Sequence, residues 1–120
     1  MQPKKILICD DEEGVRESLK IIIGEHYPLI ACATPEAAIH ALAHDQSIGV
    51  CLLDIKMPVI NGLDLLTLIK KDYPKVKIIM VTGYKSVEIA AEATRLGASG
   101  YIVKPFKAEE ILEKIEKLYK

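Results

Sequence analysis

Hydrophobic positions follow two alternating patterns along the chain. Short, nearly continuous apolar runs occupy residues 5–9, 29–33, 50–54, 77–82 and 100–104. Because these runs do not alternate with polar residues, they predict strands buried on both faces, as in a parallel sheet covered by helices. The first pattern therefore predicts five buried parallel strands.

Segments with the spacing of amphipathic helices separate these runs. We expect helices from about 12 to 25, from 35 to about 44, from 61–62 to just before Pro74, from 86 to 96–97, and from about 111 to the last residue. Thr34 and Ser86 suit helix N-caps, and Gly97 suits a C-terminal cap. The strict alternation of strand and helix predicts one doubly wound α/β domain over residues 1–120, with right-handed crossovers.

Polar side chains that could bind a ligand or react follow four of the five predicted strands. Asp10 and Asp11 follow the first strand, Asp54 ends the third, Thr82 ends the fourth and Lys104 ends the fifth. Open parallel sheets bind ligands outside the carboxyl ends of their strands, so we expect these groups to share one edge. Each residue alone fits an ordinary loop or cap, but three gathered carboxylates repel one another unless a cation lies among them.

A hard divalent cation suits this set of side chains. Mg²⁺ prefers one or two carboxylates together with carbonyl, water and phosphate oxygens, and Mn²⁺ is the alternative ion. Asp54 is then either a metal ligand only or also a nucleophile, because carboxylates attack phosphorus to form acyl phosphates. In the second case the Lys104 ammonium and the Thr82 hydroxyl would neutralise and position the phosphoryl oxygens.

Composition narrows the class of function. The net charge of −1 implies no general attraction to nucleic acid or membrane, and a single Phe with no Trp offers no stacking platform for bases. No uncharged stretch approaches the roughly 18 residues of a membrane span, and the N-terminal pattern is not that of a secretory signal. Cys9, Cys32 and Cys51 lack C-x-x-C spacing and are interpreted as small buried hydrophobic residues of a reducing cytosol, with a metal or redox role as the alternative. We therefore expect a cytoplasmic protein.

Four motifs together resemble the receiver domain of two-component response regulators, over essentially the whole chain. They are "CDDEE" at 9–13, "LLDIKMPVING" at 52–62, "VTGY" at 81–84 and "YIVKPF" at 101–106. Each motif is weak alone, but all four occur in the right order on the predicted strands. The resemblance implies a flavodoxin-like three-layer sandwich with the strand order 2-1-3-4-5 and five helices.

The resemblance also implies a chemical role for each residue at the strand ends. Asp54 would be the phosphoacceptor, and Lys104 and Thr82 would hold phosphoryl oxygens. Oxygens of four residues would hold Mg²⁺: Asp11, Asp54, the backbone carbonyl of Lys56 and, through water, Asp10.

Further positions would control the switch and the lifetime of the phosphoryl group. Thr82 and Tyr101 would be the switch residues, and the peptide bond before Pro105 would be cis. Lys56 and Tyr84, two residues after Asp54 and Thr82, are similar to the rate-tuning positions of the family. Their bulk leads to the hypothesis that they hinder attacking water and prolong the lifetime of the phosphoryl group.

The implied function is a signalling switch. A sensor histidine kinase, a phosphotransfer protein or a small acyl phosphate would donate the phosphoryl group, and the surface of the fourth helix, fifth strand and fifth helix would change in response. That surface is also the expected face for a homodimer, and a fused or separate output domain, such as a transcription regulator, is the expected target. The domain would assist its own phosphorylation and dephosphorylation without being an enzyme, and would contact neither nucleic acid nor membrane.

Three other functions compete with this interpretation. A flavin mononucleotide module needs a hydroxyl- and glycine-rich phosphate loop, whereas this chain has the repelling "DDEE" there. A Mg²⁺-dependent aspartyl phosphatase typically has a second carboxylate two residues after its nucleophile, where this chain has Lys56. A receiver-like interaction module that works without phosphorylation is disfavoured by the full set of site residues, and an assay decides between them.

Overall fold

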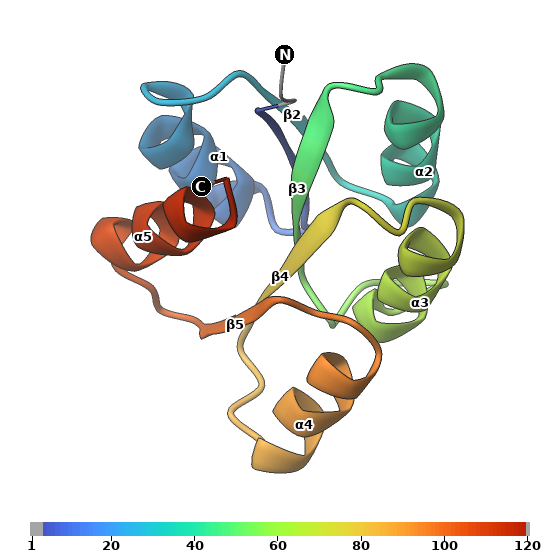
Figure 1. The fold of residues 1–120 in the computed structure, drawn as a ribbon. Coiled ribbons are helices and arrows are strands. Elements are labelled where there is room, and N and C mark those ends of the chain that lie inside the picture. Colours follow the sequence, from blue (N-terminus) through green and yellow to red (C-terminus); the bar gives the residue numbers. More distant parts are fainter. Residues whose placement is uncertain (1–3, 120) are drawn as a thin grey trace.

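A parallel sheet lies between two layers of helices in the computed structural model, which describes residues 4–119 (Figure 1). Its order β2-β1-β3-β4-β5 confirms the predicted topology, and each pair of neighbouring strands is parallel. The five strands are β1 (Lys5–Cys9), β2 (Leu29–Cys32), β3 (Ile48–Leu53), β4 (Lys77–Thr82) and β5 (Gly100–Val103).

Helices cover both faces of this sheet and bury two separate hydrophobic cores. One face carries α1 (Glu13–Gly24) and α5 (Ala108–Leu118), and the other carries α2 (Pro35–His44), α3 (Gly62–Asp72) and α4 (Val87–Arg95) (Figure 1). Leu7 and Cys9 of β1 belong to the core under α2 and α3, whereas Ile6 and Ile8 belong to the core under α1 and α5. Both faces of the strand are therefore buried, which explains its continuous apolar sequence.

Side-chain caps begin three of the helices, at the predicted caps Thr34 and Ser86 and at Asn61, where a helix start was predicted. In each case a side-chain oxygen accepts a hydrogen bond from the backbone N–H three residues later: Thr34 from Ala37, Asn61 from Asp64, and Ser86 from Ile89. At the other end of α4, Gly97 adopts a φ of 113°, which favours glycine and ends the helix. Within residues 4–119, no helix is both long and apolar enough to cross a membrane.

The last helix ends earlier than predicted. It ends at Leu118, so the expectation that it continues through Tyr119 is wrong, and Lys120 lies outside the described residues. The Tyr119 hydroxyl donates a hydrogen bond to the Lys5 carbonyl at 2.7 Å, and its ring lies 5.7 Å from that of Tyr27. These contacts hold Tyr119 as the C-cap against β1 rather than in another helical turn.

The loop between β3 and α3 contains a strained residue. Among the described residues, Val59 is the only non-glycine residue with a positive φ, at 72°, and its side chain is 97% exposed. A β-branched side chain in this region costs about 1–3 kcal/mol. No packing compensates for that cost, because the side chain lies in solvent.

We therefore expect Val59→Gly to raise the free energy of unfolding by about 1 kcal/mol, since relief of strain exceeds the entropy that glycine loses on folding. Urea denaturation of the two proteins measures the difference. Val59→Ala is the matched control and should gain less, because alanine keeps the Cβ atom that conflicts with this φ. A Val59→Gly protein no more stable than the wild type would contradict the assignment of strain.

Candidate functional site

Backbone hydrogen bonds continue the sheet beyond the carboxyl ends of its strands and align the candidate residues. The residue after β1, the residue after β3 and the residue after β5 each donate their N–H to a neighbouring strand. The donor–acceptor pairs are Asp10 to the Cys32 carbonyl at 3.2 Å, Asp54 to the Cys9 carbonyl at 3.1 Å, and Lys104 to the Thr82 carbonyl at 2.8 Å. The predicted edge therefore exists, and local strand pairing builds it.

One ammonium group lies among three carboxylates at this edge. Lys104 Nζ is 3.0 Å from Asp10 Oδ2, 3.0 Å from Glu12 Oε1 and 3.4 Å from Asp54 Oδ2. Asp10 and Asp54 are only 2% and 3% exposed, whereas Glu12 is exposed at the start of α1. A single positive charge thus faces three negative ones, two of which are shielded from water.

The pKa shifts reflect this crowding. Burial raises the pKa of the Asp10 carboxyl, against opposing contributions from the Glu12 N–H and from Lys104. Burial also acts to lower the pKa of Lys104, but its hydrogen bond to Glu12 and its contact with Asp10 outweigh burial and raise that pKa. Lys104 therefore stays protonated, and the cluster favours additional positive charge.

The acidic cluster fits a hard divalent cation. Asp10, Glu12 and Asp54 each offer a carboxylate oxygen, and these oxygens lie within 4.8 Å of one another. Asp10 Oδ2 is buried and, among residues 4–119, has no hydrogen-bond partner, because its contact with Lys104 has the distance but not the geometry of a hydrogen bond. A buried carboxylate oxygen without a donor is the type of ligand that Mg²⁺ prefers.

Asp11, predicted as a direct metal ligand, lies outside the acidic cluster. It is exposed in the loop between β1 and α1. Among residues 4–119, the carboxylates within 4.8 Å of one another are those of Asp10, Glu12 and Asp54, so Glu12 takes the place predicted for Asp11. The Glu12 N–H donates to Asp10 Oδ1 at 2.9 Å, so the loop turns Glu12 toward the cluster. The acidic run "DDEE" contained Glu12, but the sequence did not show which acidic side chain faces the site.

An open groove of about 300 Å³ lies above Asp54. Six residues line it: Glu12, Asp54, Lys56, Gly83, Tyr84 and Lys104. Among them, Lys56 and Tyr84, the two positions of the rate-tuning hypothesis, are exposed on the loops after β3 and β4. A small anionic group can reach Asp54 through this groove, between Lys56 and Lys104.

Two tyrosines connect the groove to β5. Thr82 is fully buried, and its hydroxyl accepts a hydrogen bond from the Tyr84 N–H at 3.4 Å. The Tyr101 hydroxyl donates to the Tyr84 carbonyl at 2.8 Å. Burial and the nearby Asp54 raise the pKa of Tyr101, so its phenol remains a donor. A displacement of Thr82 would therefore move the Tyr84 backbone and, through it, change the hydrogen bond of Tyr101.

Two further residues hold the site and were not assigned a role from the sequence. Gly62 packs against the backbone of Asp54, since an added Cβ would lie 1.9 Å from the Asp54 carbonyl oxygen. Arg16 of α1 donates from its guanidinium to the Asp10 carbonyl at 2.9 Å. The sequence predicted a helix start at residues 61–62, but it carried no signal for the contact of Gly62 with Asp54 or for that of Arg16 with Asp10. The Lys104–Pro105 peptide bond, expected to be cis, is cis.

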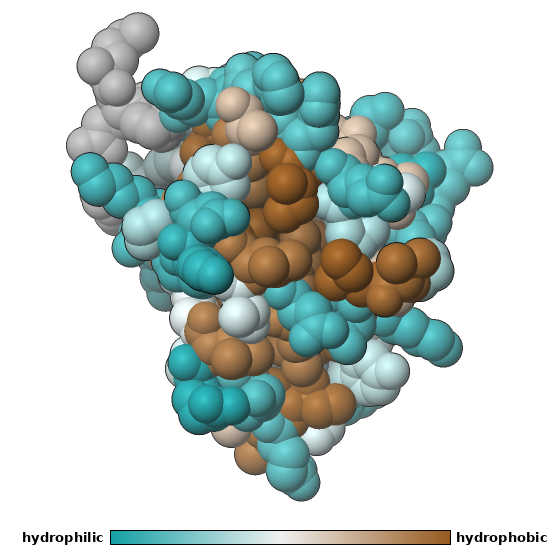
Figure 2. Space-filling view, turned by 90° about the vertical axis from the view of Figure 1, so that its right-hand side faces the viewer, coloured by the Kyte–Doolittle hydropathy of each residue, from teal (hydrophilic) through white to brown (hydrophobic). Residues whose placement is uncertain are grey.

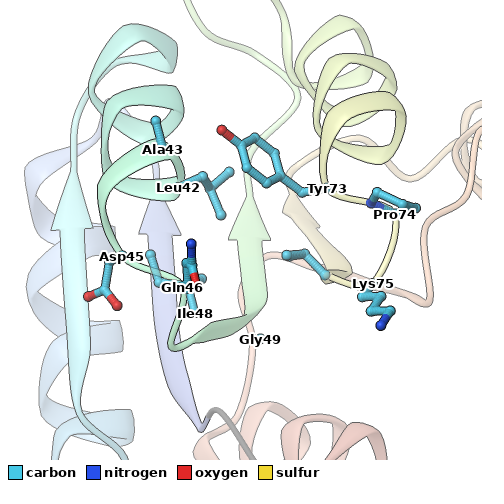
Figure 3. Close-up of a pocket in the computed structure, with 10 residues that line it drawn as sticks. Leu42, Ala43, Asp45, Gln46, Ile48, Gly49, Tyr73, Pro74 and Lys75 are labelled. Atoms are coloured by element: carbon cyan, nitrogen blue, oxygen red, sulfur yellow. The ribbon is translucent and has the colours of Figure 1, made fainter.

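A larger cavity lies at the opposite end of the sheet. It measures about 490 Å³ and lies between the ends of α2 and α3, where Leu42 and Tyr73 face each other (Figure 3). The side of the molecule formed by α2 and α3 also exposes hydrophobic residues between polar ones (Figure 2). This cavity is remote from the acidic cluster, which alone combines buried charge with an open groove among the described residues.

Known proteins are similar to this chain in sequence and in fold. A family model described as the response regulator receiver domain matches residues 6–116. The chain is 36% identical over 111 residues to Response regulator protein FleR of Pseudomonas aeruginosa, covering 91% of this chain and 23% of that protein. It is 36% identical over 113 residues to Transcriptional regulatory protein LnrK of Bacillus subtilis, covering 92% of this chain and 51% of that protein.

The structure agrees with these matches. The crystal structure of a response regulator receiver domain protein from Methanospirillum hungatei superposes with a TM-score of 0.89 at 38% identity, covering 97% of this chain and 94% of that one. The family match includes residues of all five strands and the whole acidic cluster. This chain therefore belongs to the response regulator receiver domain family.

Proposed function

We propose that the chain is a phosphorylation-dependent switch in which Asp54 accepts the phosphoryl group. The observation that carries this proposal is the buried Asp54 carboxylate at the floor of an open groove, 3.4 Å from the Lys104 ammonium. Receiver domains of response regulators are signalling domains, which agrees with this role. A structural carboxylate would need neither the groove nor the surplus of negative charge.

The reaction uses groups already gathered at the site. An oxygen of Asp54 attacks the phosphorus of a donor, a new O–P bond forms, and the donor's leaving group departs with the electrons of the broken bond. Lys104 turns from the carboxylates to the phosphoryl oxygens, whose charge it neutralises. The Thr82 hydroxyl moves toward another phosphoryl oxygen and gives up its bond from the Tyr84 N–H.

Mg²⁺ is the proposed cofactor, with Mn²⁺ as the alternative. When bound, it would neutralise the carboxylates and the incoming phosphoryl oxygens. Two sets of ligands are distinguishable: Asp11, Asp54, the Lys56 carbonyl and Asp10 through water, as the family resemblance implies, or a set that includes Glu12, as the close carboxylates suggest. Asp11→Asn and Glu12→Gln separate these sets, because the true ligand's variant weakens Mg²⁺ binding more.

The response of the fold would follow the chain of contacts from Thr82 to Tyr101. Movement of Thr82 pulls the Tyr84 backbone and weakens the bond that Tyr101 makes to it. The next helix, α4, contributes only one fully buried residue, Ala93, among those described, so it can shift at low cost. A coupling of about 1–3 kcal/mol would change the population of the active form by about 5–150-fold. The surface of α4, β5 and α5 would then carry the signal.

Partners of this switch follow from its class. We infer that a sensor histidine kinase or a phosphotransfer protein supplies the phosphoryl group, with small acyl phosphates as substitutes. The relatives FleR and LnrK are longer than this chain and are named as regulators, which supports a fused or separate output domain. A homodimer through α4, β5 and α5 is the proposed form of the activated protein.

The decisive experiment is incubation with acetyl phosphate and Mg²⁺, followed by intact mass spectrometry. The wild type should gain one phosphoryl group, EDTA should prevent the gain, and Asp54→Asn should abolish it. Asp72→Asn is the matched control, because Asp72 is an exposed carboxylate at the far end of α3. No gain in the wild type, or a gain that survives in Asp54→Asn, contradicts the proposal.

Lys56 and Tyr84 are expected to prolong the life of the phosphoryl group, because both line the groove through which water reaches Asp54. Replacing both with alanine should accelerate hydrolysis by about tenfold, equivalent to about 1.4 kcal/mol in the barrier. The decay is followed by intact mass after removal of the donor. Lys85→Ala, at the exposed neighbouring position, serves as the control. Equal decay in the double variant and the wild type would refute this role.

A further inference from the structure

Two cysteines stand side by side at the carboxyl ends of β1 and β2. Cys9 and Cys32 are paired in register on these adjacent strands. Their side chains point to the same face of the sheet, because Cys9 belongs to the core under α2 and α3 and Cys32 packs against that core. Neither the family match nor the proposed function gives these thiols a role.

Each thiol contacts a backbone carbonyl on the neighbouring strand or just beyond its end. Cys9 Sγ donates to the Thr34 carbonyl at 3.4 Å, just beyond the end of β2, and Cys32 Sγ donates to the Ile8 carbonyl of β1, also at 3.4 Å. Both sulfur atoms therefore lie at the seam between the two strands. Cys51 differs, since it lies on β3, on the other side of β1, where its register partner is Leu7.

The spacing of the strands permits a bond between the two sulfur atoms. Adjacent strands lie about 4.7–4.9 Å apart, within the Cα separation of about 4.4–6.8 Å that disulfides span. The Cβ atoms of a disulfide approach to about 3.5–4.5 Å, so one strand must move by roughly 1 Å or less. β2 is free to do so, because it is an edge strand of half-buried residues.

We propose that Cys9 and Cys32 form a reversible intrachain disulfide in response to a hydroperoxide. Cys32 reacts first, because it is partly exposed whereas Cys9 is fully buried. Its sulfur attacks the O–O bond, giving a sulfenic acid and one water when the oxidant is hydrogen peroxide. The Cys9 sulfur then attacks the sulfenic sulfur, the S–S bond forms, and the sulfenic oxygen leaves as a second water. Two thiols are oxidised and one peroxide is reduced to two waters.

The bridge would act on the strand ends that support the acidic site. Cys9 directly precedes Asp10, and the Asp10 N–H is bonded to the Cys32 carbonyl. A disulfide would therefore restrain the backbone on both sides of this hydrogen bond. The chemistry itself does not depend on phosphorylation of Asp54, so its test stands apart from that of the proposed function.

The test is treatment of the folded, reduced protein with hydrogen peroxide, followed by intact mass and peptide mapping. The wild type should lose two hydrogen atoms per chain, with the bond between the peptides that contain Cys9 and Cys32, and dithiothreitol should restore the thiols. Cys51→Ser should behave in the same way. In Cys9→Ser and Cys9→Ala, Cys32 should stop at a sulfenic acid that a cyclic 1,3-diketone traps, with circular dichroism confirming the fold.

Four results would overturn the proposal. They are a bond that involves Cys51, a bond that joins two chains, oxidation of Cys32 to a sulfinic acid in the wild type without a disulfide, and thiols that all stay reduced. Each is distinguished by the mass of the product and by mapping under non-reducing conditions.

Discussion

Gly62→Ala is expected to lower the free energy of unfolding by about 3 kcal/mol, the upper part of the range for overpacking a tight contact. An alanine Cβ would lie 1.9 Å from the Asp54 carbonyl oxygen and 2.7 Å from the Ile55 Cα, both rigid backbone atoms. The Gly62 N–H also donates to the Ile55 carbonyl at 2.7 Å, so the helix start cannot retreat without breaking that bond. Urea denaturation measures the loss.

The same substitution should damage the site. Because the clash falls on the backbone of Asp54, we expect the variant to lose most of its phosphorylation by acetyl phosphate even where it remains folded. Gly83→Ala is the matched control, since a Cβ at Gly83 meets nothing within 4 Å although this residue also lines the groove. A Gly62→Ala protein with the stability and phosphorylation rate of Gly83→Ala would show that this contact is not needed.

Lys104→Met should have the second large effect, and the size of its effect on stability depends on divalent metal. Without metal, we expect a loss of about 3 kcal/mol in the free energy of unfolding, because removal of one partner leaves the buried Asp10 and Asp54 carboxylates uncompensated. Added Mg²⁺ should recover more stability in the variant than in the wild type. The reason is that Lys104 and the cation are attracted to the same carboxylates, so removing the lysine tightens metal binding.

Thermal unfolding in EDTA tests the loss of stability without metal, and thermal unfolding across a Mg²⁺ titration tests the larger response to the cation. Lys117→Met, which removes an exposed lysine of α5, is the control and should show the metal response of the wild type. If Lys104→Met matches the wild type in EDTA and in its response to Mg²⁺, the ammonium does not neutralise the cluster. Phosphorylation of Lys104→Met should fall in either case, since Mg²⁺ cannot replace a donor to the phosphoryl oxygens.

The elements of the fold could be predicted because their causes are local. Burial of both strand faces, the side-chain caps of Thr34, Asn61 and Ser86, and the glycine after α4 are all written in short stretches of sequence. The end of α5 was misplaced by the same reasoning. Its limit depends on the Tyr119 hydroxyl reaching Lys5, a contact between opposite ends of the chain.

The sequence by itself determined the α/β class, the order of elements and the arrival of Asp10, Asp54, Thr82 and Lys104 at one edge, because strand ends in a parallel sheet share an edge whatever the side chains do. Only the tertiary structure decided that Glu12 and not Asp11 approaches Lys104, that Gly62 abuts Asp54, and that Cys9 pairs with Cys32. These outcomes depend on the register of the strands and on the direction of side chains in loops. Both depend on the three-dimensional path of the backbone at the strand ends and loops, which the hydrophobic periodicity of a single element does not encode.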